Sequence, residues 1–242
     1  MSARADGVDL KPTFSLECDA ILFDLDGVLV DSTTRVAQTW ERWARKHGLD
    51  PERVIEAAHG RRTIETVQLV APHLADTDEV ANLEASEASN TEGVLEIPGA
   101  RELLKGLPLD RWAIVTSGIR AVATLRIRHT GLPMPNVLVC AEDIRHGKPD
   151  PEGYLTAARK LGVDPSKCLV IEDTPPGLEA ARAGGMVSIG VAGTYPAAAL
   201  AGADYTIPRL DGLTSRNSRV LTATERERGV SRILVSYQFT TP

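Results

Sequence analysis

Short apolar runs bounded by Gly, Asp or Pro recur along the chain. They are AILF at 20–23, WAIV at 112–115, VLVC at 137–140, CLVI at 168–171 and MVSIGV at 186–191. Near-continuous apolar runs of this length are typical of strands that are buried on both faces. Segments with helical spacing separate them, and two of these stop at Gly131 and Gly162, which suit helix ends. This alternation predicts an α/β fold with a Rossmann-like parallel sheet covered by helices on both faces.

One long segment breaks the alternation. From about residue 32 to residue 97 no strand is predicted, and apolar residues such as Val36, Trp40 and Trp43 fall at helical spacing. Turn-like sequences bound the segment on both sides. We therefore predict an all-helical cap at 33–97, inserted into a core domain made of residues 18–32 and 98–212. A helical insert at this place is a candidate lid over a site.

The two ends of the chain do not follow the pattern of the core. Residues 1–17 are polar and predict a loose N-terminal arm, and residues 213–242 form a C-terminal tail of uncertain structure. Within this tail, the sequence ILVSYQF alternates like a strand. The side chains expected on one side of it are Ile233, Val235, Tyr237 and Phe239.

Composition narrows the class of protein. Of 242 residues, 43% are hydrophobic and 25% charged, and the net charge of -6 disfavours non-specific nucleic-acid binding. The three cysteines form no C-x-x-C pair, which predicts buried free thiols and a reducing compartment. The N-terminus lacks an apolar signal core, and no apolar stretch is long enough to span a membrane. We expect a cytoplasmic protein without nucleic-acid or membrane partners.

The sequence FDLDGVLVDS places Asp24 and Asp26 directly after the first predicted strand. Ligand sites in open α/β sheets lie at the carboxyl ends of the strands. One carboxylate there can attack phosphorus while the other moves a proton. Asp-Gly also marks plain hairpins, so a structural turn is the alternative. A calcium loop is disfavoured because Val28 and Leu29 stand where an oxygen ligand and a glycine are needed.

Two further motifs offer groups that bind an anion. Thr116, Ser117 and Gly118 follow the WAIV strand and precede a helix, where a hydroxyl and backbone N–H groups bind phosphate oxygens. A simple helix N-cap is the alternative. Lys148 lies in the proline-stiffened segment HGKPDPEGY, and its ammonium can neutralise both a phosphate and an Asp nucleophile. A solvated lysine is the alternative there.

The fourth motif, VIEDTPPG, ends a strand with Glu172 and Asp173. Carboxylates gathered with those of Asp24 and Asp26 make a hard-oxygen site that suits octahedral Mg²⁺. Capping of the next helix is the alternative. Each motif is weak alone, but each lies at the end of a separate predicted strand. Together they supply the nucleophile, acid, anion-binding groups, cation and metal ligands that phosphoryl transfer requires.

These motifs resemble those of the haloacid dehalogenase superfamily of phosphatases over about residues 18–212. DLDGVLVDS is similar to its first motif, TSG to its second, Lys148 in GKPDP to its third and EDTPPG to its fourth. The resemblance implies that Asp24 is the nucleophile and Asp26 the acid–base, with Thr116 and Lys148 as further catalytic groups. It also implies that Mg²⁺ is held by Asp24, Asp26, Asp173 and Glu172. Asp26 favours phosphate chemistry, because the dehalogenases of the superfamily lack this residue.

The string HGRRTIETV in the predicted cap resembles the substrate loop of small sugar- and polyol-phosphate phosphatases. It implies that His59, Arg61, Arg62 and Thr63 face the substrate, with a solvated helix face as the alternative for the arginines. The expected activity is hydrolysis of a small phosphorylated metabolite through an aspartyl-phosphate, by a monomer or homodimer. A phosphomutase of the β-phosphoglucomutase type is the alternative. A non-catalytic binding protein is disfavoured, because all the catalytic acids are present.

Overall fold

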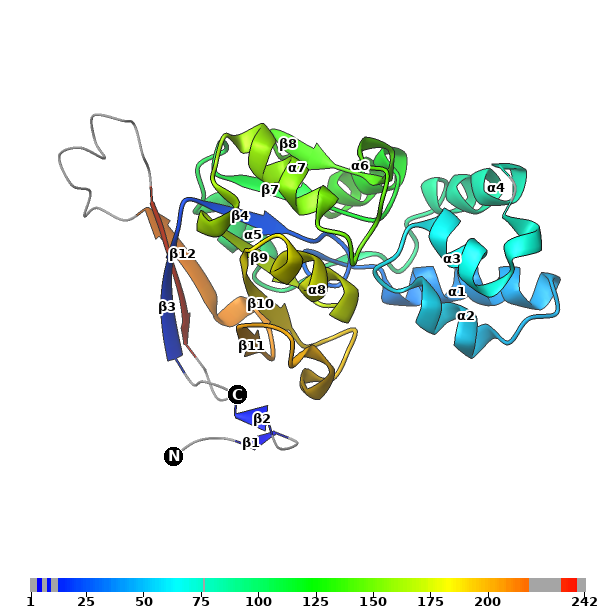
Figure 1. Ribbon diagram of the computed structural model, residues 1–242, viewed down its shortest axis with the longest axis horizontal. Helices are drawn as coiled ribbons and strands as arrows, with labels where there is room; N and C mark the ends of the chain where they lie inside the picture. Colours follow the sequence, from blue (N-terminus) through cyan, green and yellow to red (C-terminus); the bar gives the residue numbers. More distant parts are fainter. Residues whose placement is uncertain (1–3, 6–7, 10–12, 76, 218–231, 239–242) are drawn as a thin grey trace.

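A central parallel sheet organises the computed structural model, which describes residues 4–5, 8–9, 13–75, 77–217 and 232–238. Its six strands run in the order β11-β10-β9-β4-β7-β8 (Figure 1), and every neighbouring pair is parallel. They are β4 (Ala20–Phe23), β7 (Trp112–Val115), β8 (Val137–Val139), β9 (Cys168–Glu172), β10 (Val187–Val191) and β11 (Tyr205–Ile207). The predicted α/β fold is confirmed.

Helices cover both faces of this sheet, which explains the continuous apolar runs. Successive side chains of β4 point to opposite faces. Ile21 and Phe23 pack in one core with residues of α5 (Ala100–Lys105) and α6 (Arg120–Thr130). Ala20 and Leu22 pack in a second core with residues of α7 (Glu152–Leu161) and α8 (Pro175–Ala183). Short 3₁₀ helices are η1 (Pro72–Leu74), η2 (Ala141–Asp143), η3 (Pro165–Lys167), η4 (Ala197–Leu200) and η5 (Leu210–Gly212).

A helical body lies beyond one end of the sheet (Figure 1) and consists of α1 (Thr33–Lys46), α2 (Pro51–Ala58), α3 (Thr63–Val70) and α4 (Thr77–Ala88). It has its own apolar cluster, which includes Trp40, Trp43 and Val67. Two short strands, β5 (Val30–Asp31) and β6 (Leu95–Glu96), pair antiparallel where the chain enters and leaves this body. The segment predicted to be all helical therefore holds one short strand, β6, which only its pairing with β5 reveals.

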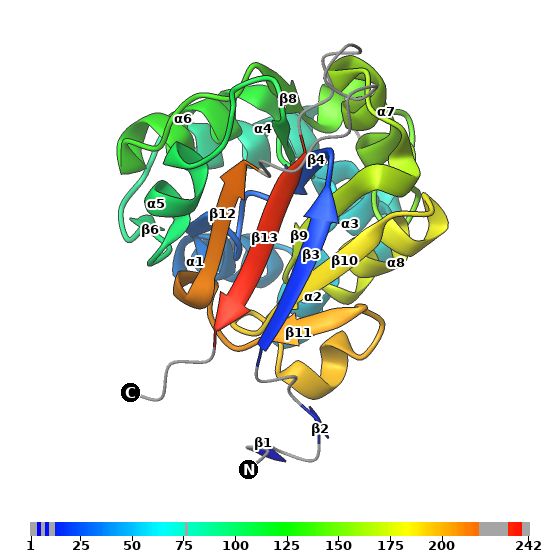
Figure 2. The same cartoon turned by 90° about the vertical axis from the view of Figure 1, so that its left-hand side faces the viewer.

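A three-stranded antiparallel sheet lies at the other end of the molecule from the helical body (Figures 1 and 2). Its order is β12-β13-β3, with β3 (Thr13–Cys18), β12 (Leu213–Asn217) and β13 (Ile233–Gln238). The alternation in β13 is as predicted for Ile233, Val235 and Tyr237, which are buried; Phe239 lies outside the described residues. Two-residue strands β1 (Arg4–Ala5) and β2 (Val8–Asp9) pair with each other.

The loose arm expected over residues 1–17 does not extend to Thr13, because β3 is a paired strand from there on. Backbone pairing with β13 runs from Thr13 to Cys18. The ring of Phe14 lies 4.5 Å from that of Tyr205 and 5.7 Å from that of Tyr237, measured between centroids. The pairing partner of β3 is more than two hundred residues away in the sequence, so no local pattern indicates it.

The three cysteines agree with the expectation of buried free thiols. Cys18, Cys140 and Cys168 are free and buried. Burial raises the pKa of each of these thiols to about 12, so they stay protonated and unreactive. Among the described residues, no helix is both long and apolar enough to cross a membrane.

Val235→Ala tests whether the C-terminal strand is part of the core. Val235 is fully buried, so we expect the free energy of unfolding to fall by about 2 kcal/mol. Urea denaturation measures this loss. The matched control is Ser236→Ala on the outer face, whose hydroxyl only meets Ser15 at an exposed position; it should change stability by less than about 0.5 kcal/mol. Equal effects of the two substitutions would contradict the packing of β13.

Candidate active site

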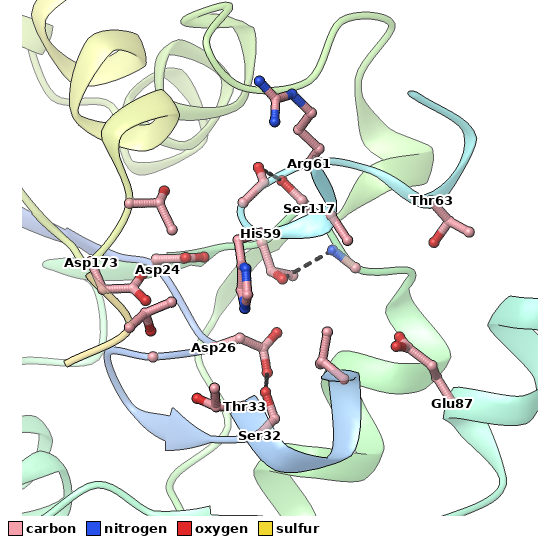
Figure 3. A pocket seen from close by; sticks show the side chains of 18 of the residues that line it. Asp24, Asp26, Ser32, Thr33, His59, Arg61, Thr63, Glu87, Ser117 and Asp173 are labelled. Carbon is pink, nitrogen blue, oxygen red and sulfur yellow. Dashed lines mark hydrogen bonds between the residues drawn. The ribbon is translucent and has the colours of Figure 1, made fainter. Parts of the chain in front are cut away.

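Four segments that are distant in the sequence meet at the carboxyl edge of the central sheet. Asp24 follows β4, Thr116 follows β7, and Glu172 and Asp173 lie at the end of β9. Lys148 lies in the segment between β8 and α7. Because the strands are parallel, their carboxyl ends share one edge, and side chains just beyond them converge. The structure therefore brings together the core residues that the sequence singles out, and Figure 3 shows Asp24, Asp26, Ser117 and Asp173 among them.

Lys148 lies between two buried carboxylates. Its Nζ is 3.0 Å from Asp24 Oδ1 and 2.5 Å from Glu172 Oε1. Burial by itself would lower the pKa of Lys148, but the charges of Asp24 and Glu172 outweigh it and raise the pKa above its ordinary value. Burial would raise the pKa of Glu172, and here the adjacent Lys148 outweighs it and lowers the pKa. Lys148 is thus a fixed cation that orients the Asp24 carboxylate.

Both oxygens of Glu172 are occupied by protein donors. Oε1 accepts from Lys148 and from the Tyr154 hydroxyl at 2.9 Å. Oε2 accepts from the backbone N–H groups of Asp173 and Thr174, at 2.8 and 2.9 Å, and from the Thr174 hydroxyl at 2.9 Å. A Cβ at Gly177 would overlap this carboxylate, so the first turn of α8 can approach Glu172 only because residue 177 is a glycine. Glu172 therefore holds the loop and Lys148 in place.

The cluster of Asp24, Glu172 and Asp173 carries more negative than positive charge. Oxygens of the three carboxylates lie within 4.8 Å of one another, and among the described residues the Lys148 ammonium bonds to two of the three, Asp24 and Glu172. Burial raises the pKa of Asp24 to about 7, and Lys148 opposes this shift. Burial, followed by the charges of Glu172 and Asp24, raises the pKa of Asp173 well above its ordinary value.

Asp173 also has an oxygen without a partner. Its Oδ1 is buried and accepts no hydrogen bond from any described residue. A buried carboxylate oxygen in this state is costly unless a cation or another donor meets it. Gly27, with φ of 80°, passes so close that a Cβ there would overlap the Asp173 carboxylate. The oxygen-only donor set and the surplus charge fit a hard divalent cation such as Mg²⁺.

The segment 116–118 lies between β7 and α6 and borders the helical body. The Thr116 hydroxyl accepts from the Gly118 N–H at 3.1 Å. The Ser117 hydroxyl donates to the Gly60 carbonyl, 2.8 Å away, in the connection between α2 and α3. Ser117 therefore joins the sheet edge to the helical body, and all three residues of this segment line the cavity.

Of the four residues expected in the substrate loop, three line the cavity: His59, Arg61 and Thr63. His59 Nε2 is buried without a hydrogen-bond partner among the described residues, and burial lowers the pKa of this ring. Arg62 is placed elsewhere. Its guanidinium donates to Glu65 at 2.6 Å and to the carbonyls of Ile144 and Arg145, at 3.2 and 2.6 Å. Arg62 thus ties the start of α3 to the loop that carries Lys148.

Asp26 has two hydrogen-bond donors, Ser32 and Arg126, that no sequence motif indicated. Its Oδ1 accepts from the Ser32 hydroxyl at 2.6 Å and from Arg126 Nη1 at 2.7 Å. Arg126 comes from α6 and is almost fully buried. It shares the buried side of that helix with Val122, Ala123 and Ile127. A charged residue at an apolar position of a helix is the one signal in the sequence that could have indicated it.

A cavity between the sheet edge and the helical body has a volume of about 690 Å³ including its open mouth, and Lys148 and Glu172 lie behind its lining. The side chains that line it from the core include Asp24, Asp26, Thr116, Arg126 and Asp173, and those from the helical body include Trp40, His59, Arg61, Thr63 and Glu87. Acidic, hydroxyl and basic groups therefore meet around one open cavity.

Comparison with known proteins agrees with this geometry. The model of the haloacid dehalogenase-like hydrolase family matches residues 18–185. Hexitol phosphatase A of Escherichia coli is 40% identical over 207 residues, which cover 82% of this chain and 94% of that protein. Glycerol-1-phosphate phosphohydrolase 2 of Saccharomyces cerevisiae is 38% identical over 201 residues, covering 78% and 80%.

A solved structure agrees as well. The crystal structure of a hydrolase from Pseudomonas syringae superposes with a TM-score of 0.70 at 27% identity, and the match covers 79% of this chain and 94% of that one. The family model spans well over half of the present chain, and it includes the four segments that meet at the sheet edge. The chain belongs to the haloacid dehalogenase-like hydrolase family.

Proposed function

We propose that this chain is a Mg²⁺-dependent phosphomonoesterase that hydrolyses a small sugar or polyol phosphate through an aspartyl-phosphate on Asp24. The observation that carries the proposal is the Asp24 carboxylate, held 3.0 Å from Lys148 at the floor of a cavity that Asp26, Thr116 and Asp173 also line. The names of the relatives support a phosphatase acting on hexitol or glycerol phosphates.

In the first step, a carboxylate oxygen of Asp24 attacks phosphorus in line with the leaving alcohol. The bond from Asp24 to phosphorus forms as the bond from phosphorus to the alcohol oxygen breaks, and Asp26 gives its proton to that oxygen. Lys148 fixes one oxygen of Asp24, which limits rotation of the carboxylate and favours attack along one line. Ser32 and Arg126 hold the Asp26 carboxyl group in place.

In the second step, water attacks the phosphorus of the aspartyl-phosphate. Asp26, now a carboxylate, takes the proton of this water, and the bond between phosphorus and Asp24 breaks to give inorganic phosphate and free enzyme. The donors assigned to the phosphate oxygens are the Thr116 hydroxyl, the Ser117 N–H and Lys148. Gly118 lies beside them, and its N–H donates to Thr116 and holds that hydroxyl in place.

The residues assigned to Mg²⁺ are Asp24, Asp173 and the Asp26 carbonyl. Glu172 positions this site indirectly, through its hydrogen bonds to Lys148 and to the backbone of Asp173. Bound there, Mg²⁺ supplies positive charge that balances the carboxylates and the phosphate oxygens. The expected cytoplasmic location, and the expected monomer or homodimer, stay predictions.

Asp24→Asn tests the nucleophile. An amide cannot form the acyl phosphate, so phosphate release from a panel of sugar and polyol phosphates should fall at least about 10³-fold. Circular dichroism checks that the variant is folded. Asp110→Asn, in the exposed turn before β7, is the matched control and should keep full activity. Substantial turnover by Asp24→Asn would refute the assignment.

Removal and return of the metal test the carboxylate cluster. Treatment with EDTA should abolish phosphate release, and added Mg²⁺ should restore it. Asp173→Asn should raise the Mg²⁺ concentration for half-maximal activity by about tenfold or more, because one ligand loses its charge. Mg²⁺ should also raise the melting temperature of the wild type, because it binds the folded state alone. Activity that is indifferent to EDTA would count against the metal.

The phosphomutase alternative shares the same core residues and differs in the acceptor of the phosphoryl group. Wild-type protein with a single sugar or polyol phosphate and no bisphosphate should release inorganic phosphate in stoichiometric amounts. A colorimetric phosphate assay beside chromatography of the sugar products separates the two reactions. Isomerised sugar phosphate that appears only after priming with a bisphosphate, without free phosphate, would favour the mutase.

A further inference from the structure

Two charged side chains of the cavity, Glu87 and Arg126, carry groups that the phosphoryl chemistry proposed above does not use: the Glu87 carboxylate and the second guanidinium nitrogen of Arg126. Glu87 comes from α4 in the helical body, and Arg126 comes from α6 beside the central sheet. The two side chains are 15% and 5% exposed, and both line the cavity. Arg126 donates to Asp26, from which the leaving alcohol receives its proton, and Glu87 lies beside Arg126. Their position is therefore that of groups that meet the alcohol part of the substrate.

The hydrogen bonds of Arg126 are incomplete. Nη1 donates to Asp26 at 2.7 Å. Nη2 is buried and has no hydrogen-bond partner among the described residues. Glu87 Oε2 lies 3.6 Å from Nη2, which is beyond a normal hydrogen bond. A guanidinium does not lose its proton in proteins, so an unmade N–H bond in this buried place needs another acceptor.

We propose that Glu87 and Arg126 form a pair that binds a hydroxyl group of the leaving alcohol. A hydroxyl both donates and accepts, so it can accept from Arg126 Nη2 while it donates to the Glu87 carboxylate. This satisfies the buried donor and gives the carboxylate a bond that Arg126 alone does not reach. The inference rests on the proposed phosphatase function and assigns its substrate class: a neutral, polyhydroxylated alcohol.

Charge on this wall of the cavity disfavours a second anionic group in the substrate. Arg126 is the one cation of the pair, and it already faces the carboxylates of Asp26 and Glu87. A carboxylate or a second phosphate in the alcohol part would meet Glu87 with like charge. Arg61 is the other arginine of the cavity, and Figure 3 places it on the opposite side from Glu87.

The pair is assembled from two parts of the fold. Helices α4 and α6 contact each other, so Glu87 reaches Arg126 only when the helical body lies against the core. The same guanidinium holds Asp26 through Nη1. A hydroxyl bound at Nη2 would therefore contact the same guanidinium that holds Asp26, the group assigned to protonate the leaving oxygen. Arg126 thus links recognition of the alcohol to the position of Asp26.

Steady-state kinetics with matched esters test the pair. The probes are sorbitol 6-phosphate, n-hexyl phosphate, which has the same carbon number without the hydroxyls, and phosphoglycolate, which carries a carboxylate. Glu87→Ala should lower kcat/KM for sorbitol 6-phosphate by about tenfold to a hundredfold, because a buried bond to a charged group is lost. The value for hexyl phosphate should change by less than about threefold. Glu87→Gln should raise the value for phosphoglycolate.

Glu84→Gln is the matched control, since Glu84 lies one turn earlier on α4 and is not among the residues that line the cavity. It should leave all three values as they are in the wild type. Equal losses on sorbitol 6-phosphate and hexyl phosphate in Glu87→Ala, from an enzyme that stays active, would overturn this inference and leave the proposed function standing. A wild type inactive on every one of these esters would overturn both.

Discussion

The site depends on one buried ammonium shared between two carboxylates. Lys148 lies 3.0 Å from Asp24 and 2.5 Å from Glu172, in a place where none of the three side chains meets much water. Charges in such a place are stable only if they are paired and hydrogen-bonded, and removal of one partner leaves the other uncompensated. The pairing therefore fixes the geometry of Asp24 and explains why Glu172 is so fully bonded to the loop around it.

The rest of the fold positions this group and closes the space above it. Parallel strands bring Asp24, Thr116 and Asp173 to one edge, and the helical body covers that edge through a small number of polar contacts. Ser117 donates to Gly60, and Arg62 donates to the loop next to Lys148. These contacts are few and polar, and the helical body has a separate apolar cluster. An arrangement of this kind is suited to a cover that opens for substrate and product.

Much of this was predictable from sequence, because the central strands and their terminal acids are local patterns. The apolar runs predicted five of the six strands of the central sheet, all but β11, and the side chains after them converge as expected for parallel strands. The residues that were missed depend on pairing across long distances. Strand β3 exists because β13 pairs with it, and Arg126 resembles an ordinary helical arginine until its helix packs beside Asp26. Arg62 carries the charge expected of a substrate ligand, but its neighbours in space make it a tie between helical body and core.

The central claim is that Asp24 becomes covalently phosphorylated. Acid quenching of the wild type within the first turnover on sorbitol 6-phosphate, followed by mass spectrometry of the peptide that spans residues 18–32, tests it most directly. The account predicts a peptide heavier by one phosphoryl group, with fragment ions that place the group on Asp24. Full hydrolytic activity with no phosphorylated peptide, or with the phosphoryl group on another residue, would contradict it.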